Sequence, residues 1–151
     1  MKHNAQWHSA TIRAQRDLSP SVREFEIRPE RGVHPWSVGS HLDLRVLVDG
    51  REEKRSYSLV GLPPAPGGAP GADEVYRIAV RRATPGRGGS RWLWSLQTGD
   101  ELLIGEPNNH FEVGWTAPHT LLVAGGIGIT PILGMAQQLA QRGAPLRMLY
   151  A

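Results

Sequence analysis

Cysteine is absent from the 151 residues of this chain. Its absence excludes a disulfide framework, a catalytic thiol, a cysteine-ligated zinc site and any iron–sulfur cluster held by thiolates of this chain. Long apolar runs are also missing, and no stretch approaches the roughly 20 apolar residues that span a bilayer. The first residues, 1–6, are not followed by the apolar stretch of a secretory signal peptide. We therefore expect a cytoplasmic globular protein with no membrane partner.

Lysine is scarce as well, because Lys2 and Lys54 are the only lysines among 17 basic residues. Against 14 acidic residues, the basic residues give a formal net charge of +3. No long run of like charges occurs, so the sequence does not predict a nucleic-acid surface. Arginine suits phosphate, because its planar guanidinium can donate two parallel hydrogen bonds. The six histidines are scattered without metal-ligand spacing, and no metal site is predicted.

Most of the chain reads as short strands divided by turns. Residues 41–48 place Leu42, Leu44 and Val46 on one face with mostly polar residues between them, which is the period of a half-buried strand. Asp49-Gly50 then supplies a tight turn. Similar patterns predict strands at residues 7–13, 24–28, 54–59, 75–82, 102–104 and 111–113, and a Gly- and Pro-rich hairpin loop at 61–73. Such a series of strands favours an antiparallel barrel or sandwich.

The pattern changes after Pro118. Residues 120–124 read as a buried strand and 125–128 as a glycine turn, and Pro131 and Gly143 are suited to the first turn and to the end of a helix. A second apolar strand follows at 146–150, and so short a unit cannot cover both faces of its own sheet. We therefore expect a mainly β chain, with a six-stranded antiparallel barrel in residues 1–115. Residues 116–151 would be the incomplete, truncated N-terminal portion of an α/β domain.

Arg55-Ser56-Tyr57-Ser58 is the first motif that carries chemistry. Arginine offers a phosphate clamp, tyrosine an aromatic wall with a hydroxyl, and serine a small donor. On a strand, Arg55 and Tyr57 share one face and the two serines the other. An ordinary strand end with a surface arginine would contain the same residue types.

A glycine-rich loop, residues 86–90, is the second motif. Its glycines allow backbone amides to turn toward an anion, and Ser90 is suited to cap the short helix that follows. A helix N-terminus reached through such a loop is a common phosphate site. A flexible loop after Pro85 is the alternative, and Trp92 and Trp94 are interpreted as helix packing.

Gly126-x-Gly128-x-x-Pro131 is the third motif. It lies between a buried strand and a helix, as a dinucleotide-binding turn does. Pro131 replaces the third glycine of the usual fingerprint, so a purely structural turn would explain the pattern equally well.

The order of these three motifs along the chain resembles the ferredoxin reductase-like flavoproteins. Within that family the pattern is most similar to the FMN-containing reductases of Rieske-type oxygenases, the phthalate dioxygenase reductase and vanillate O-demethylase oxidoreductase group. The resemblance runs from about residue 38 to Tyr150 and includes residues 78–82, 96–100 and 107–111. The family's Pro-Arg-Asn run appears here as Pro107-Asn108-Asn109, so this chain has asparagine in place of that arginine.

The resemblance implies a role for each motif. Arg55 would bind the flavin phosphate, Tyr57 would lie against the flavin, and Ser58 would sit near the ring nitrogen that accepts hydride. Thr130 would border the nicotinamide and, with Ser58, would be catalytic. The other implied cofactor-binding residues, at the isoalloxazine edge, the phosphate and the nicotinamide, are Ala79, Val80, Arg81, Gly88, Gly89, Ser90, Gly126 and Gly128.

The same resemblance implies a flavin-binding barrel followed by part of an NAD(P)-binding domain. Its activity would be that of an FMN-dependent NAD(P)H oxidoreductase, with NAD(P)H as substrate and FMN preferred to FAD. Electrons would pass to an iron–sulfur domain or oxygenase component, and a 2Fe–2S cluster is expected only in a region absent from this chain. The alternatives are an FAD-dependent flavin or siderophore-type reductase, or a non-catalytic flavin-binding module that needs a partner chain.

Overall fold

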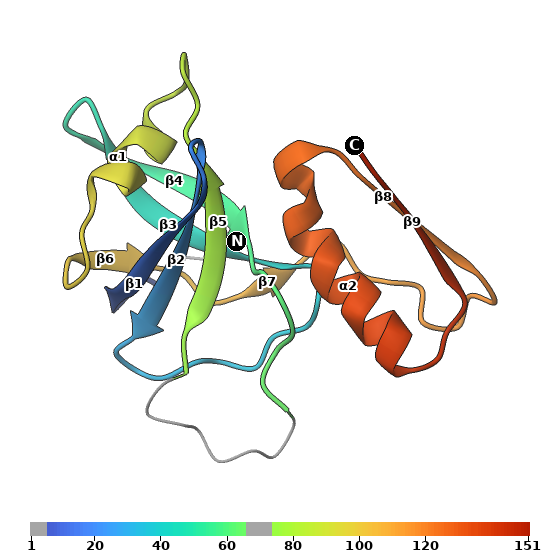
Figure 1. Cartoon of the computed structure of the whole chain (residues 1–151). Coiled ribbons are helices and arrows are strands. Elements are labelled where there is room, and N and C mark those ends of the chain that lie inside the picture. The colour runs from blue at the N-terminus through green and yellow to red at the C-terminus, as the bar shows by residue number, and fades with distance from the viewer. Residues whose placement is uncertain (1–5, 66–73) are drawn as a thin grey trace, which may run out of the picture.

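The computed structural model describes residues 6–65 and 74–151. An antiparallel sheet curls into a barrel, helix α2 lies beside it, and a small parallel sheet lies on the far side of α2 (Figure 1). The mainly β architecture that the sequence predicts is confirmed. The barrel strands are β1 (His8–Ser19), β2 (Val22–Pro29), β3 (Ser40–Val48), β4 (Arg51–Ser58), β5 (Tyr76–Arg81), β6 (Glu101–Ile104) and β7 (Asn108–Asn109).

The barrel core follows from the alternation of apolar residues along its strands. Leu42, Leu44 and Val46 of β3 have no solvent exposure, as their spacing predicts. The strand order is β4-β3-β6-β1-β2-β5, with β7 paired to β3. The turn from β3 to β4 has positive φ at both Asp49 (49°) and Gly50 (74°), which is the geometry of a two-residue hairpin.

The sheet stays open between its edge strands, β4 and β5. No β-ladder joins these two strands in the part of the chain that the structure describes. One backbone hydrogen bond connects the segment just after β4 to β5: the Val60 N–H donates to the Arg77 carbonyl at 2.9 Å. Helix α1 (Gly89–Ser95) packs at one end of the barrel and buries Leu93 completely (Figure 1). An open seam therefore runs between β4 and β5, beside α1.

The C-terminal part is a strand-helix-strand unit. Strand β8 (Thr120–Ala124) leads through a 3₁₀ turn, η1 (Gly126–Gly128), into α2 (Ile129–Gln141), and β9 (Leu146–Tyr150) pairs with β8 in parallel. Pro131 lies in the first turn of α2, where its missing N–H costs nothing. Gly143 has φ 65° just past the helix end, and the Ala144 N–H reaches the Leu139 carbonyl at 3.0 Å.

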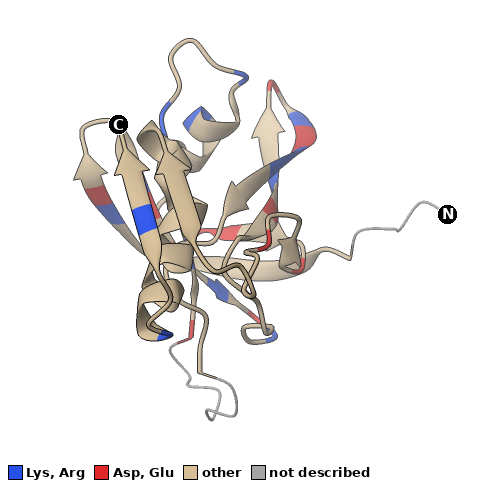
Figure 2. Cartoon of the chain, turned by 90° about the vertical axis from the view of Figure 1, so that its right-hand side faces the viewer, with Lys and Arg blue, Asp and Glu red and all other residues tan. Residues whose placement is uncertain are grey.

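One face of this small sheet packs on α2 and the other is bare. Leu122 and Ala124 are buried against Ile132, Met135 and Leu139 of the helix. On the opposite face the apolar residues Leu121, Val123 and Leu149 are each about 60% exposed. Figure 2 views the molecule from this side, where the ribbon carries few charged residues.

Close backbone approach fixes α2 against the barrel. A Cβ atom on Gly134 of α2 would lie 2.3 Å from the carbonyl oxygen and 3.2 Å from the carbonyl carbon of Gly61. Because real Cβ contacts are never so short, only glycine allows these segments to meet. The spacing between the two parts is thus set largely by backbone.

Some local predictions were wrong. Residues 111–113 are not a strand: the Phe111 side chain is 52% exposed and its N–H donates to Oδ1 of Asn109 at 2.9 Å. Instead, β7 pairs with β3 two residues earlier. Strand β4 begins at Arg51, not Lys54, and α2 begins at Ile129. Of the loop predicted at 61–73, residues 66–73 lie outside the described residues.

Two features are absent from the described residues. None of their helices is long and apolar enough to cross a membrane. No group of their His, Asp and Glu side chains could hold a metal ion.

Candidate functional site

A hollow of about 440 Å³ lies at the open seam of the barrel. Strands β4 and β5, the start of α1 and the turn before α2 enclose it, so all three sequence motifs meet there. Its lining consists of Arg55, Ser56, Tyr57, Ser58, Ala79, Arg81, Ala83, Arg87, Gly89, Ser90, Ile127, Gly128, Thr130 and Pro131.

One end of the hollow is cationic. Arg55, Arg81 and Arg87 line it, and none of its described lining residues is acidic. Arg55 is held in place, because its Nη2 lies 2.5 Å from Oε2 of Glu53 and its Nη1 donates to the Lys54 carbonyl at 2.9 Å. A fixed guanidinium loses less side-chain entropy when it binds an anion. This end is therefore prepared for a phosphate or carboxylate.

Helix α1 packs directly on the Arg55 side chain. A Cβ atom on Gly89 would lie 2.9 Å from both Cγ and Nε of Arg55. Gly88, which precedes the helix, has φ 89°, a conformation that favours glycine. Gly89 therefore allows the helix to approach Arg55 closely, and Gly88 allows the turn that leads into the helix.

Ser90 differs in detail from its predicted role. The N-cap position belongs to Gly88, and Ser90 lies inside the first turn of α1. Its Oγ accepts a hydrogen bond from the Ala83 N–H at 3.2 Å. A hydroxyl that accepts in this way can still donate its own proton. Ser90 thus fastens α1 to the chain after β5 and offers a donor to the hollow.

Tyr57 and Ser58 form the β4 wall. Burial raises the pKa of the Tyr57 hydroxyl, with the positive charge of Arg55 opposing that shift, so the phenol stays neutral over the usual pH range. Ser56 points its hydroxyl away, to the Asp43 carboxylate on β3. Arg55 and Tyr57 therefore share a face, as predicted, and the Ser56 hydroxyl is directed to β3, but both Ser56 and Ser58 also line the hollow.

The glycine turn forms the opposite wall. The Gly126 N–H donates to the Ala151 carbonyl and the Gly128 N–H to the Gly125 carbonyl, both at 2.9 Å. The Thr130 hydroxyl donates to the Ile127 carbonyl at 3.1 Å, and the Tyr150 hydroxyl to Gly126 at 3.2 Å. These amides are satisfied internally, so the turn acts as a rigid, small-residue wall rather than as a phosphate cradle.

A second hollow of about 450 Å³ continues the first. The two share Ala79, Arg81, Ile127 and Thr130 in their linings. The second is more apolar, with Leu18 and Tyr150 among its lining residues. A small side chain at Ala79 leaves the passage open between a cationic end and an apolar end.

Most predicted site residues line these hollows. Val80 and Gly88 line neither: the Val80 side chain lies in the barrel core and its carbonyl accepts a hydrogen bond from Nε1 of Trp94 at 3.1 Å. Gly126 lines only the second hollow. Sequence reasoning missed the side chain of Arg87, although a cation inside a glycine-rich loop was a usable signal. The other unpredicted lining residues of the first hollow are Ser56, Ala83, Ile127 and Pro131.

The arrangement suits a ligand with an anionic group at one end and a flat ring at the other. Arg55, Arg87 and the Ser90 hydroxyl can satisfy a phosphate, since charge-assisted hydrogen bonds are the strong ones, whereas Arg81 lines both hollows. Helix α1 spans only seven residues, so its dipole adds little beside those full charges. Tyr57 on one wall and the small residues of the glycine turn on the other leave space for a ring.

Comparison with known proteins agrees with this geometry. No family model matches the chain. The chain is 41% identical to the heme-dependent oxidative N-demethylase beta subunit of Ectopseudomonas mendocina over 143 residues. This alignment covers 93% of this chain and 43% of that protein. The chain is also 37% identical to the vanillate O-demethylase oxidoreductase of Acinetobacter baylyi over 136 residues. This alignment covers 88% of this chain and 40% of that protein.

A solved structure shares the fold as well. Phthalate dioxygenase reductase, described as a modular structure for electron transfer from pyridine nucleotides to 2Fe–2S, matches 95% of this chain and 43% of its own with a TM-score of 0.78 and 32% identity. The chain spans about two fifths of the length of these relatives. By sequence and fold the chain is homologous to part of the reductase components of oxygenase systems, and it shares the ferredoxin reductase-like fold of phthalate dioxygenase reductase.

Proposed function

We propose that this chain is the flavin-binding part of an NAD(P)H oxidoreductase and that its flavin is FMN. Electrons would pass from NAD(P)H through the flavin to an iron–sulfur domain or oxygenase component. In this proposal residues 1–115 form the flavin domain and residues 116–151 the first part of the nucleotide domain. A bound flavin supplies the hydride and single-electron chemistry, and the protein supplies position and polarity.

The observation that carries the proposal is the meeting of the three motifs at the open seam. Arg55, pre-positioned by Glu53, would take the flavin phosphate, with Arg87 and the Ser90 hydroxyl as further donors. Tyr57 would cover one side of the ring, and Gly128 and Thr130 would leave room for the nicotinamide on the other. The Ser58 hydroxyl, at the end of β4, would donate to the ring edge.

One terminal phosphate is the simplest ligand for the cationic end, which supports FMN over FAD. Arg55 and Arg87 meet there, and Nη2 of Arg55 lies 3.5 Å from the Arg87 carbonyl. The resemblance to the FMN-containing reductases supports the same choice. An FAD-dependent flavin or siderophore-type reductase is the competing enzyme.

Flavin titration tests this proposal. The purified chain, stripped of any yellow chromophore, would be titrated with riboflavin, FMN and FAD while flavin fluorescence is recorded. We expect FMN to bind more tightly than riboflavin, because the phosphate adds charge-assisted hydrogen bonds. Tighter binding of FAD than of FMN would favour the competing enzyme, and failure to bind any flavin would contradict the proposal.

The bare face of the β8–β9 sheet favours a second candidate, a flavin-binding module that works only with a partner chain. Leu121, Val123 and Leu149 present apolar surface there of the kind that packs against other protein. Anaerobic mixing of the FMN-loaded chain with NADH or NADPH separates the two candidates. Loss of the flavin absorbance would support the reductase, whereas an unchanged spectrum with both nucleotides would support the module.

A further inference from the structure

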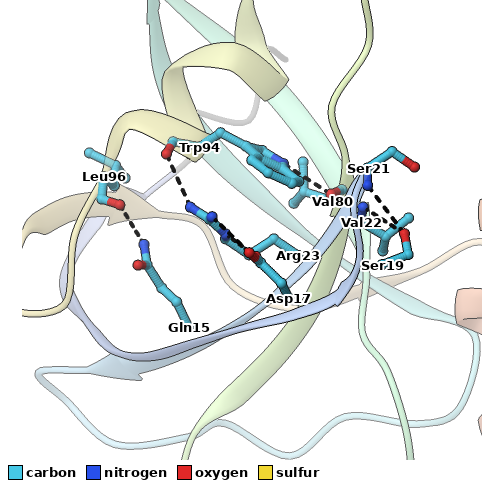
Figure 3. Close-up of polar contacts among 9 residues, drawn as sticks. All are labelled: Gln15, Asp17, Ser19, Ser21, Val22, Arg23, Val80, Trp94 and Leu96. Atoms are coloured by element: carbon cyan, nitrogen blue, oxygen red, sulfur yellow. Dashed lines mark hydrogen bonds and ion pairs between the residues drawn. The ribbon is translucent and has the colours of Figure 1, made fainter.

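Trp94, near the end of α1, is fastened to two strands of the barrel (Figure 3). Its indole Nε1 donates to the Val80 carbonyl of β5 at 3.1 Å. Its own carbonyl accepts a hydrogen bond from Nη1 of Arg23 on β2 at 3.3 Å. Because Arg23 and Val80 are direct cross-strand partners, both contacts anchor the helix at one point of the sheet.

Two guanidinium groups also lie over the Trp94 ring. The Cζ atom of Arg23 is 4.3 Å from the ring centroid and that of Arg82 is 4.8 Å away, within the range of cation–π attraction. Arg23 is itself held by Asp17, with Nε–Oδ1 at 2.6 Å and Nη2–Oδ2 at 3.3 Å. Asp17, Arg23 and Trp94 therefore form a cluster of defined geometry (Figure 3).

The other end of α1 carries the residues that line the cationic hollow. Ser90 is fastened to Ala83, just beyond β5, and Gly89 packs against the Arg55 side chain. The helix is thus attached to β5 or its extension at both ends. A change at Trp94 would alter the angle at which Gly89 and Ser90 meet Arg55.

We propose that Trp94 is a positioning residue for the anion-binding end of the hollow. The inference rests on the proposed flavin function, and Trp94 acts through α1 without touching the ligand. Trp92 provides the comparison within the same helix, because it also packs against the barrel core. In the described part of the chain the Trp92 side chain makes none of the polar contacts that Trp94 makes.

The test compares the affinities of FMN and riboflavin, which differ only by the phosphate. Trp94→Phe removes the indole donor and keeps a ring, and Arg23→Gln removes the ring contact and the bond to the Trp94 carbonyl. We expect each variant to raise the Kd of FMN about fivefold, the scale of one hydrogen bond, and to leave the Kd of riboflavin within about twofold. Trp92→Phe is the matched control and should leave both unchanged.

Three results would overturn the inference. One is unchanged FMN affinity in Trp94→Phe and Arg23→Gln proteins that keep the wild-type circular dichroism spectrum; Arg23→Gln alone decides if Trp94→Phe fails to fold. Another is an equal loss of FMN and riboflavin affinity, which would mean that Trp94 only stabilises the fold. If the unmodified chain binds no flavin, the proposed function fails first, and that outcome is distinct from the other two.

Discussion

Glu53 and Arg55, two residues apart on β4, form an ion pair with 2.5 Å between Oε2 and Nη2. Residues at this spacing share one face of a strand, so the carboxylate holds the guanidinium from the side. The Arg55 side chain is only 25% exposed, so its charge is less screened by water than that of a fully solvated arginine, while the Glu53 carboxylate offsets part of that charge. The hollow thus contains a cation whose position is set before any ligand arrives.

Arg55→Ala should weaken FMN binding by roughly 1.5 kcal/mol or more, the low end for a hydrogen bond to a charged group. The measurement is the Kd of FMN by fluorescence titration. Arg77→Ala is the control, because Arg77 also pairs with a glutamate, Glu26, but lies outside this hollow. Equal FMN affinity in the wild type and Arg55→Ala would remove Arg55 from the site.

Gly89→Ala should also weaken FMN binding, because its methyl group would displace the Arg55 side chain from which it would lie 2.9 Å. Arginine is flexible, so we expect the fold to survive and the phosphate contact to suffer. Gly114→Ala, whose Cβ would meet only Ala117 at 3.9 Å, is the matched glycine control. If Gly89→Ala binds FMN as tightly as the control does, Gly89 does not position Arg55 for the phosphate.

Gly134→Ala should destabilise the protein. Alanine alone would favour a helix by about 1 kcal/mol over glycine. Its Cβ would lie 2.3 Å from the Gly61 carbonyl, however, and overpacking against backbone costs about 1–3 kcal/mol. We expect the steric cost to prevail and the Tm to fall, as measured by circular dichroism. Gly125→Ala, with open space around its Cβ, should change the Tm little, and a Tm at or above wild type for Gly134→Ala would refute the close approach.

Asp17 should contribute to the acid sensitivity of the fold. Hydrogen bonds from Arg23 lower the pKa of its carboxyl below the ordinary value, and desolvation opposes this shift. A depressed pKa in the folded state adds stability above the unfolded pKa, near pH 4, and that stability is lost as the pH falls through the folded value. The Tm gap between wild type and Asp17→Asn should therefore shrink from about pH 6 to about pH 3. A gap that stays constant over this range would contradict the assignment.

The elements with strong local signals were predictable from sequence. Alternation of Leu42, Leu44 and Val46 fixed β3, and Asp49-Gly50 marked its hairpin. Strand β7 could not be predicted, because it depends on Asn109, whose Nδ2 donates to Ser37 Oγ at 2.7 Å and to the Val38 carbonyl at 3.0 Å. Such contacts join residues about seventy positions apart and leave no periodic pattern in the chain.

The site was predictable in its composition and less so in its geometry. Arg55 and Ser90 were identified by motif and Thr130 through the family resemblance, and all three line the hollow. The internal bonding of the glycine turn and the Ser90 bond to Ala83 depend on backbone positions that only the folded chain defines. The hydrogen bonds of Trp94 could not be predicted from sequence for a related reason, because its partners, Val80 and Arg23, lie on two different strands.

The open seam between β4 and β5 would let a bound ligand contribute to the stability of the barrel. A flat molecule seated there would shield two strand edges that the described fold leaves without a ladder to each other. Amide hydrogen exchange in Arg55–Ser58 and Ala79–Arg81 should accordingly slow when the hollow fills, more than in the interior strand β1. Local opening of β4 and β5 would then be coupled to dissociation of the ligand, so that amide exchange and ligand residence time would report the same motion.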